Sequence, residues 1–264
     1  MERSFTQREW HHIQLRDVAV PAAVADRAFY AAFYRRLLAG TEAIDPLWLE
    51  QKRRLGRWIV GEFLSTAREG ARVLSIGAGL GVVEGEIATH GVGVDILECE
   101  PASLRFAVTH YSQLRPLVGD ARALPLQSGA YDLVCVAGVD YAFPRSEYVD
   151  VLREARRVLR AGGRAVVICL SNLSLPEMLR TLRPRRAAAM SGDTVPWGYQ
   201  RSVGEHIGAA RRAGLLTERV YQLNARCEPE SSRSGRSWFA RGLPGPVCQW
   251  PSRLPNPECR PCRC

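Results

Sequence analysis

The stretch "RVLSIGAGLGVVEGEIATHGVGVDILE", residues 72–98, decides the fold. A short apolar run, "RVLSI", leads into the glycine-rich turn "GAGLG" at residues 77–81, and an amphipathic segment and a second apolar run follow. A strand, a glycine turn and a helix in this order bind a cofactor at the carboxyl end of a parallel sheet. The residues of the turn restrict which cofactor that is.

The glycine spacing argues against two common cofactor loops. A dinucleotide turn reads G-x-G-x-x-G/A, but here the glycines are Gly77, Gly79 and Gly81, and Val82 takes the position of the third dinucleotide glycine. A β-branched residue there hinders close packing of the helix on the strand. The phosphate-loop pattern also fails, because no Gly-Lys-Ser/Thr follows.

The apolar runs that follow predict a parallel sheet. They are "GVGVDILE", "RPLVGD", "YDLVCVAG" and "GGRAVVICL", separated by helical patterns such as "EYVDVLREARRVLRAGG". Strands this apolar, alternating with helices, indicate an α/β fold whose sheet is covered on both faces. Later, "SVGEHIGAARRAGL" predicts a helix, and "TERVYQLNA" and "GRSWFARG" predict two consecutive strands that pair antiparallel at one edge.

The flanks differ from this core. Apolar residues three and four apart, such as Phe29, Phe33 and Leu37, predict that residues 1–70 form a helical extension. We expect residues 71–242 to form the core and the Pro/Arg/Cys-rich residues 243–264 to lack order. The tail motif "CRPC" has the spacing of metal ligands, but the tail lacks hydrophobic periodicity, so we expect no metal there.

Composition narrows the partners. Residues 1–150 carry 16 basic and 19 acidic side chains, and residues 151–264 carry 20 and 8. An arginine-rich face can attract an anionic partner. A preference for arginine over lysine also fits a GC-rich coding sequence. No apolar run approaches the ~18 residues of a membrane span, and the first residues lack an apolar signal core. We therefore expect a cytoplasmic protein without membrane contact; the sequence leaves its oligomeric state open.

Four motifs in residues 72–170 resemble the class I S-adenosylmethionine-dependent methyltransferases. They are the G-x-G-x-G turn, the segment "ECEPASLRFA" after the second strand, "VGDARALPLQSGAYDLV", and "YVDVLREARRVLRAGGRAVV". The resemblance implies a Rossmann-like, seven-stranded, mostly parallel sheet with an antiparallel C-terminal edge strand. It also implies S-adenosylmethionine as cofactor and S-adenosylhomocysteine as product, with residues 1–70 and 171–200 forming a roof over the substrate.

The resemblance also implies a set of cofactor contacts. In the family an acid at the end of the second strand holds the ribose hydroxyls; the motif spacing favours Glu98, and Asp95 is the alternative. Asp120 would accept a hydrogen bond from the adenine amino group, with Ala121 supplying a backbone amide, and the start of the helix after the turn would face the methionine carboxylate. Most relatives carry an acid where this chain has Ser75, so we expect weakened cofactor binding. The full set is Ser75, Gly77, Ala78, Gly79, Gly81, Glu98, Cys99, Asp120, Ala121 and Ala137.

The chemistry needs few catalytic groups, because methyl transfer from a sulfonium depends mainly on alignment. Asp140 and Tyr141, after the fourth strand, and His206, a candidate base, are the residues we expect near the acceptor. The Asn/Asp-Pro-Pro-Tyr/Phe motif of enzymes that methylate amino or amide nitrogens is absent. The first hypothesis is a small-molecule methyltransferase. The alternatives are an RNA methyltransferase that uses the arginine-rich half, and a non-catalytic cofactor-binding protein.

Overall fold

The structure is a computed structural model of the chain. It describes residues 3–7, 9–10, 13–18, 27–39, 44–66, 69–169, 195–222 and 248–253. Within these residues no helix is both long and apolar enough to cross a membrane.

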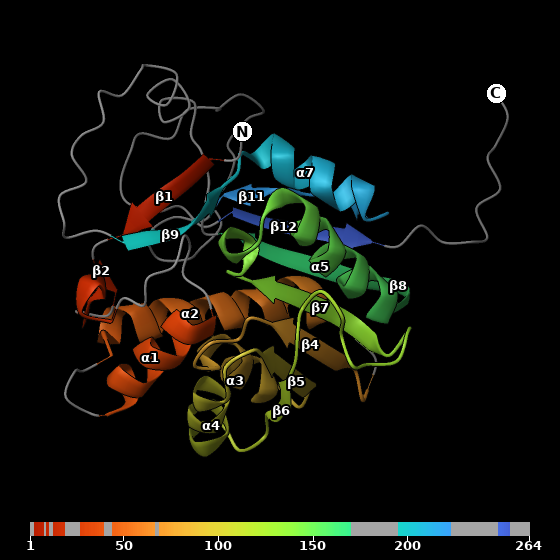
Figure 1. The fold of residues 1–264 in the computed structure, drawn as a ribbon. Helices are drawn as coiled ribbons and strands as arrows, with labels where there is room; N and C mark the ends of the chain where they lie inside the picture. Colours follow the sequence, from red (N-terminus) through yellow and green to blue (C-terminus); the bar gives the residue numbers. More distant parts are fainter. Residues whose placement is uncertain are drawn as a thin grey trace, which may run out of the picture.

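A parallel sheet forms the centre of the molecule (Figure 1). Its strands are β4 (Arg72–Ile76), β5 (Gly93–Glu98), β6 (Arg115–Val118), β7 (Tyr131–Ala137) and β8 (Leu159–Cys169). They lie in the order β6-β5-β4-β7-β8 and every neighbouring pair is parallel. The predicted α/β fold with a parallel sheet is confirmed, and the strand order reverses beside β4, where such sheets bind ligands.

Short strands lie antiparallel beyond β8. They are β10 (Leu216–Thr217), β11 (Tyr221–Gln222) and β12 (Cys248–Arg253), and β12 pairs with β8. The edge strand expected at residues 235–242 lies outside the described residues, so the seven-stranded sheet with an antiparallel C-terminal edge stays a prediction. We expected residues 243–264 to lack order, yet residues 248–253 form β12; the rest of that tail, with the "CRPC" motif, lies outside the described residues.

The two faces of the sheet are covered by different helices. Along β4, Val73 packs in a cluster with Leu55 and Ile87, whereas the next residue, Leu74, packs in a cluster with Leu152. This alternation follows from the period of two in a strand. One face therefore carries α2 (Pro46–Ile59), α3 (Val82–Ala88) and α4 (Pro101–His110), and the other carries α5 (Arg145–Val158) and α7 (Val203–Arg212).

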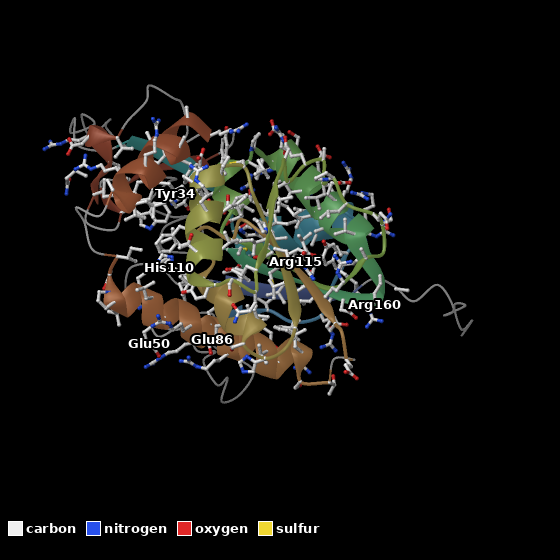
Figure 2. All side chains as sticks on the ribbon, turned by 90° about the horizontal axis from the view of Figure 1, so that it is seen from below. Tyr34, Glu50, Glu86, His110, Arg115 and Arg160 are labelled. Atoms are coloured by element: carbon white, nitrogen blue, oxygen red, sulfur yellow. The ribbon has the colours of Figure 1, made fainter. Side chains whose placement is uncertain are left out.

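Helices α2 and α3 pack closely because α2 has a glycine at the crossing. A Cβ on Gly56 would lie 2.7 Å from the Cβ of Glu86 and 2.8 Å from the backbone oxygen of Val83. Arg57 then joins the helices at the surface, where Nη2 lies 3.0 Å from Glu50 Oε1 and Nη1 lies 3.5 Å from Glu86 Oε1. Glu50 and Glu86 are labelled in Figure 2. Beyond Ile59, α2 continues as the π-helical turn η2 (Val60–Leu64).

Among the described residues the N-terminal region is helical only in part, and the helical extension that forms the substrate roof over residues 1–70 stays a prediction. Before α1 (Arg27–Leu38) the chain forms the strands β1 (Arg3–Gln7), β2 (Glu9–Trp10) and β3 (Ile13–Gln14) and the 3₁₀ turn η1 (Leu15–Asp17). Strand β1 pairs antiparallel with β9 (Val195–Gln200), a partner that no local pattern could reveal. Phe29 and Phe33 of α1 pack with Leu80 and Tyr141, so α1 covers the carboxyl ends of the central strands.

Candidate functional site

A cavity of about 620 Å³ lies at the carboxyl ends of β4, β5 and β7. Most of the cofactor contacts expected from the sequence line it, namely Gly77, Ala78, Gly79, Glu98, Cys99, Asp120, Ala121 and Ala137. Tyr141 lines it as well. The structure therefore brings these residues together around one space, whereas Ser75, Gly81, Asp140 and His206 are not among the lining residues.

The glycine turn has a backbone that other residues would not tolerate. Gly77 has a φ of 83° and Gly81 a φ of 72°, both in the left-handed region that favours glycine. A Cβ on Gly77 would lie 2.0 Å from Cγ1 of Val139, and one on Gly81 would lie 2.8 Å from Cβ of Ala107. The turn therefore brings bare backbone to the edge of the cavity.

Glu98 and Asp95 belong to the same strand but face different surroundings. Glu98 is half-buried on the cavity, and its Oε1 accepts a hydrogen bond of 2.5 Å from the backbone amide of Gly79. Burial raises the pKa of Glu98 to about 7. Asp95 does not line the cavity; its carboxylate lies 2.8 Å from Arg72 and 2.5 Å from Arg115. Burial opposes ionisation of Asp95, but the hydrogen bonds from Arg115 and Arg72 outweigh it and lower its pKa.

Ser75 is fully buried beneath the turn and has an unexpected partner. Its Oγ donates a hydrogen bond of 2.6 Å to Oε1 of Glu84, on α3. Glu84 is buried, lines the cavity, and has no hydrogen-bond partner for Oε2. Burial raises the pKa of Glu84 to about 7. The sequence analysis missed Glu84, although an acid three and four residues before the apolar Ile87 and Ala88 of the same helix is a signal in itself.

Asp120 lies at the open rim of the cavity. It is exposed, and its Oδ2 lies 2.6 Å from Nη2 of Arg122, which lowers the pKa of Asp120. Ala121 is buried beside it, and Val118 lines the same part of the cavity with 55% of its surface exposed. The rim therefore offers the apolar surface of Val118 and Ala121 next to the Asp120 carboxylate, which is paired with Arg122.

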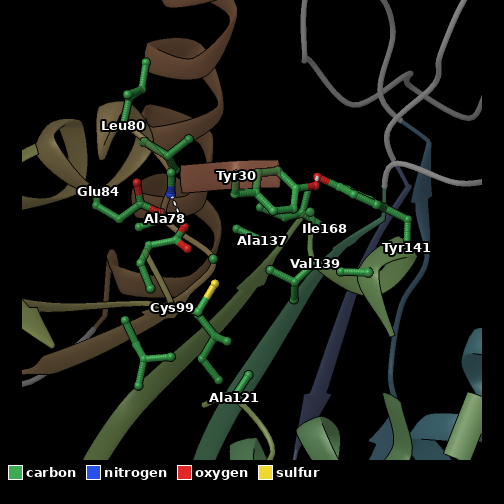
Figure 3. A pocket seen from close by; sticks show the side chains of 18 of the residues that line it. Tyr30, Ala78, Leu80, Glu84, Cys99, Ala121, Ala137, Val139, Tyr141 and Ile168 are labelled. Atoms are coloured by element: carbon green, nitrogen blue, oxygen red, sulfur yellow. Dashed lines mark hydrogen bonds between the residues drawn. The ribbon is translucent and has the colours of Figure 1, made fainter. Parts of the chain in front are cut away.

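An aromatic roof closes the opposite side of the cavity. Tyr30 on α1 donates a hydrogen bond of 2.8 Å to the hydroxyl of Tyr141, in the 3₁₀ turn η3 (Asp140–Ala142). Burial raises the pKa of both tyrosines, so both phenols stay protonated near neutral pH. Trp10, Tyr34 and Trp48 also line the cavity, and the hydroxyl of Tyr34 would lie 3.3 Å from a Cβ on Gly79. Figure 3 shows Glu84 beside Ala78 at one end of the view and the Tyr30–Tyr141 pair at the other.

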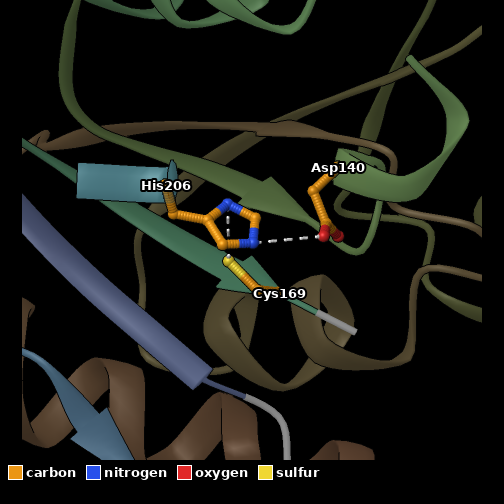
Figure 4. Close-up of side chains that lie close together, drawn as sticks. All are labelled: Asp140, Cys169 and His206. Atoms are coloured by element: carbon orange, nitrogen blue, oxygen red, sulfur yellow. Dashed lines mark hydrogen bonds and ion pairs between the residues drawn. The ribbon is translucent and has the colours of Figure 1, made fainter. Parts of the chain in front are cut away.

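Asp140 and His206 meet behind the wall of the cavity (Figure 4). His206 Nε2 lies 3.6 Å from Asp140 Oδ2, while Nδ1 lies 3.1 Å from the hydroxyl of Tyr148 and 3.5 Å from Sγ of Cys169. All four side chains are almost fully buried. The cluster links η3 to β8, α5 and α7, and so fixes the turn that carries Tyr141. A catalytic role for Asp140 or His206 stays a prediction.

Comparisons with known proteins find methyltransferases. A methyltransferase-domain family model matches residues 73–163. A demethylmenaquinone methyltransferase from Beutenbergia cavernae is 36% identical over 38% of this chain and 41% of its own. The C-methyltransferase UbiE of ubiquinone/menaquinone biosynthesis from Roseobacter denitrificans is 28% identical over 50% of this chain and 58% of its own. The chain thus spans less than two thirds of either relative.

Solved structures give the same fold. A TehB-like S-adenosylmethionine-dependent methyltransferase from Corynebacterium glutamicum aligns with a TM-score of 0.53 at 21% identity, covering 86% of this chain and 96% of its own. The [4+2]-cyclase SpnF aligns with a TM-score of 0.57 at 16% identity, covering 77% of this chain and 81% of its own. At these identities the likeness shows the fold alone.

Proposed function

Because the chain belongs to the class I S-adenosylmethionine-dependent methyltransferase family, we propose that it transfers a methyl group to a small-molecule acceptor. The observation that carries the proposal is the single cavity that runs from the glycine turn to the aromatic roof. One end of this space suits the cofactor, and the other suits the molecule to be methylated.

The residues at the turn suit S-adenosylmethionine. Gly77 and Gly79 line the cavity, and neither has a Cβ that would stand between the backbone and a ligand. Glu98 offers a carboxylate to the two ribose hydroxyls, whereas Asp95 is held by arginines away from the cavity. Asp120, Ala121 and the exposed Val118 would hold the adenine at the rim. When bound, the cofactor supplies a methyl group on a sulfonium, which reacts without an external activator.

The roof suits an apolar, planar acceptor. Trp10, Tyr34 and Trp48 present aromatic surface to the cavity, and the Tyr30–Tyr141 pair adds neutral hydroxyl groups that can orient a polar atom of the acceptor. Both relatives named above act, by their names, in quinone methylation, which supports an aromatic acceptor here. Holding the acceptor against the methyl group would supply much of the rate by proximity.

The described arginines give little support to RNA as the acceptor. In the second half of the chain, Arg153 pairs with Asp150, Arg157 with Glu154 and Arg160 with Asp132. These pairs neutralise charge that a phosphate track would need.

Two measurements test the proposal. Calorimetry compares binding of S-adenosylmethionine, S-adenosylhomocysteine and NAD; tight NAD binding without response to either sulfur compound would contradict it. Transfer of a radiolabelled methyl group is then measured with a soluble naphthoquinol and with RNA as acceptors. Cofactor binding without transfer to either acceptor would favour a non-catalytic cofactor-binding protein, and transfer to RNA alone would favour the second hypothesis.

A further inference from the structure

Glu84 has an oxygen that the protein itself does not use. The side chain is 1% exposed; Oε1 is held by Ser75, and Oε2 is buried without a hydrogen-bond partner. A buried acceptor in this state costs free energy, and native proteins rarely keep one without a reason. Because Glu84 also lines the cavity, the reason lies in what the cavity binds.

The surroundings of Glu84 favour a cationic ligand group. Its neighbours are the hydroxyl of Ser75, the thiol of Cys135 and the carboxylate of Glu98, which add no positive charge. Lys52 of α2 acts on Glu84 through space, without an ion pair to it among the described residues. When ionised, Glu84 and Glu98 together form a negative pole beside the glycine turn.

Given the proposed function, on which this step rests, we infer that Glu84 accepts the α-ammonium group of the cofactor's methionine part. Ser75 fixes one carboxylate oxygen and so aims the other at the ligand. The position usually acidic in the family is Ser75 here, and the charge it lacks is supplied from α3, nine residues later in the chain. Ser75 is then a positioning residue for Glu84, and the expected weakening of cofactor binding by Ser75 is offset.

The test compares two ligands that differ at the methionine end. S-adenosylhomocysteine carries the α-ammonium group, whereas 5′-methylthioadenosine keeps the adenosine and lacks the amino acid. Glu84→Gln keeps the shape of the side chain and a hydrogen bond to Ser75 while removing the charge. Calorimetry should show S-adenosylhomocysteine binding about 10- to 100-fold more weakly to Glu84→Gln, from the loss of one charged hydrogen bond. Binding of 5′-methylthioadenosine should change by less than about twofold.

Two further variants serve as controls. Glu86→Gln removes a carboxylate from the same helix, but one that faces Arg57 at 3.5 Å, and should leave both affinities unchanged. Ser75→Ala should weaken S-adenosylhomocysteine by about 2- to 10-fold and leave 5′-methylthioadenosine unaffected. Thermal unfolding without ligand checks the fold; Glu84→Gln should unfold at the same or a higher temperature, because it removes a buried carboxyl group.

The outcomes separate the inference from the proposed function. If wild type binds both ligands and Glu84→Gln weakens both equally, or neither, the inference is wrong and the proposed function stands. If wild type binds neither ligand, the proposed function is wrong and the inference falls with it. A loss confined to S-adenosylhomocysteine, in a variant as stable as wild type, supports both.

Discussion

At the amino-terminal ends of the strands each acidic side chain lies beside arginines, whereas at the carboxyl ends two carboxylates face a cavity without an ion pair to any described residue. Asp95 lies between Arg72 and Arg115, and Asp132 lies 2.5 Å from Arg160. Glu84 accepts a hydrogen bond from the hydroxyl of Ser75, and Glu98 accepts one from the backbone amide of Gly79. Asp95 and Asp132 are thus paired where they stabilise the fold, whereas Glu84 and Glu98 have no ion pair to a described residue where a ligand can bind.

The largest expected effect is on cofactor affinity, through the carboxylates at the carboxyl ends of the strands. Glu98→Gln should weaken S-adenosylhomocysteine by about 100-fold or more, because two charge-assisted hydrogen bonds to the ribose are lost. Asp95→Asn is the matched variant on the same strand and should leave the affinity unchanged. Calorimetry measures the affinity of both variants for S-adenosylhomocysteine. A larger loss of affinity in Asp95→Asn than in Glu98→Gln would show that Asp95 holds the ribose.

The next largest effect is on the free energy of unfolding, through the ion pairs at the amino-terminal ends of the strands. Asp95→Asn removes a buried charge from between Arg72 and Arg115, and the loss should be about 2 kcal/mol. This is below the range for fully buried pairs because both arginines are about half exposed. The midpoint of thermal unfolding should fall by about 4–8 °C. Glu98→Gln should not lower it; a similar fall in both variants would remove the contrast between the two ends.

The acids at the carboxyl ends of the strands and Asp95 at the amino-terminal ends should change stability with pH in opposite directions. Burial raises the pKa of Glu84 from 4.5 to about 7, so the folded chain keeps a proton that the unfolded chain releases. Stability without ligand should therefore fall as pH rises from about 4.5 to 7, by up to about 3 kcal/mol for this group, and stay level above. Glu98, which faces Glu84, acts in the same direction, while Ser75 and the charge of Lys52 moderate the shift.

The lowered pKa of Asp95 gives the reverse dependence. Its contribution is present above the ordinary value of 3.8 and is lost as pH falls through the lowered folded value. Urea unfolding from pH 3 to 8 measures both windows. Glu84→Gln should flatten the curve between 4.5 and 7, and Asp95→Asn only below about 4; a wild-type curve that rises between pH 5 and 7 would contradict the first assignment.

The smallest effect is expected at the roof. Tyr30→Phe removes the hydrogen bond between two neutral phenols and should lower kcat/KM for the acceptor by about 2- to 10-fold. Affinity for S-adenosylhomocysteine should stay the same, because neither tyrosine is among the residues proposed to hold the cofactor. An equal loss of cofactor affinity would place Tyr30 at the cofactor instead.

The sequence predicted the parts of this comparison that depend on local pattern. Five apolar runs marked the parallel strands. Strands β4, β5 and β7 are apolar because they are buried on both faces, whereas the edge strand β6 is mostly exposed. Motif spacing favoured Glu98 over Asp95, and the structure places only Glu98 on the cavity. That assignment depended on counting residues from Gly81, which needs no knowledge of packing.

The parts that depend on tertiary contacts were missed. Ser75 was interpreted as a lost charge because its partner, Glu84, becomes adjacent only when the turn folds α3 back over β4. His206 was a candidate base because a helix pattern does not tell which face meets the cavity; in the structure it faces Asp140 behind the wall. The pairing of β1 with β9 could not be predicted, since its two strands lie at distant places in the chain.

That last pairing has a consequence for how the molecule is made. Strand β1 is synthesised long before β9, and at about 5–20 residues per second it waits on the order of ten to forty seconds for its partner. The parallel strands, synthesised in between, can assemble during this interval. The β1–β9 pair then forms after the parallel strands, and until β9 is made the unpaired edge of β1 is exposed to wrong strand pairing.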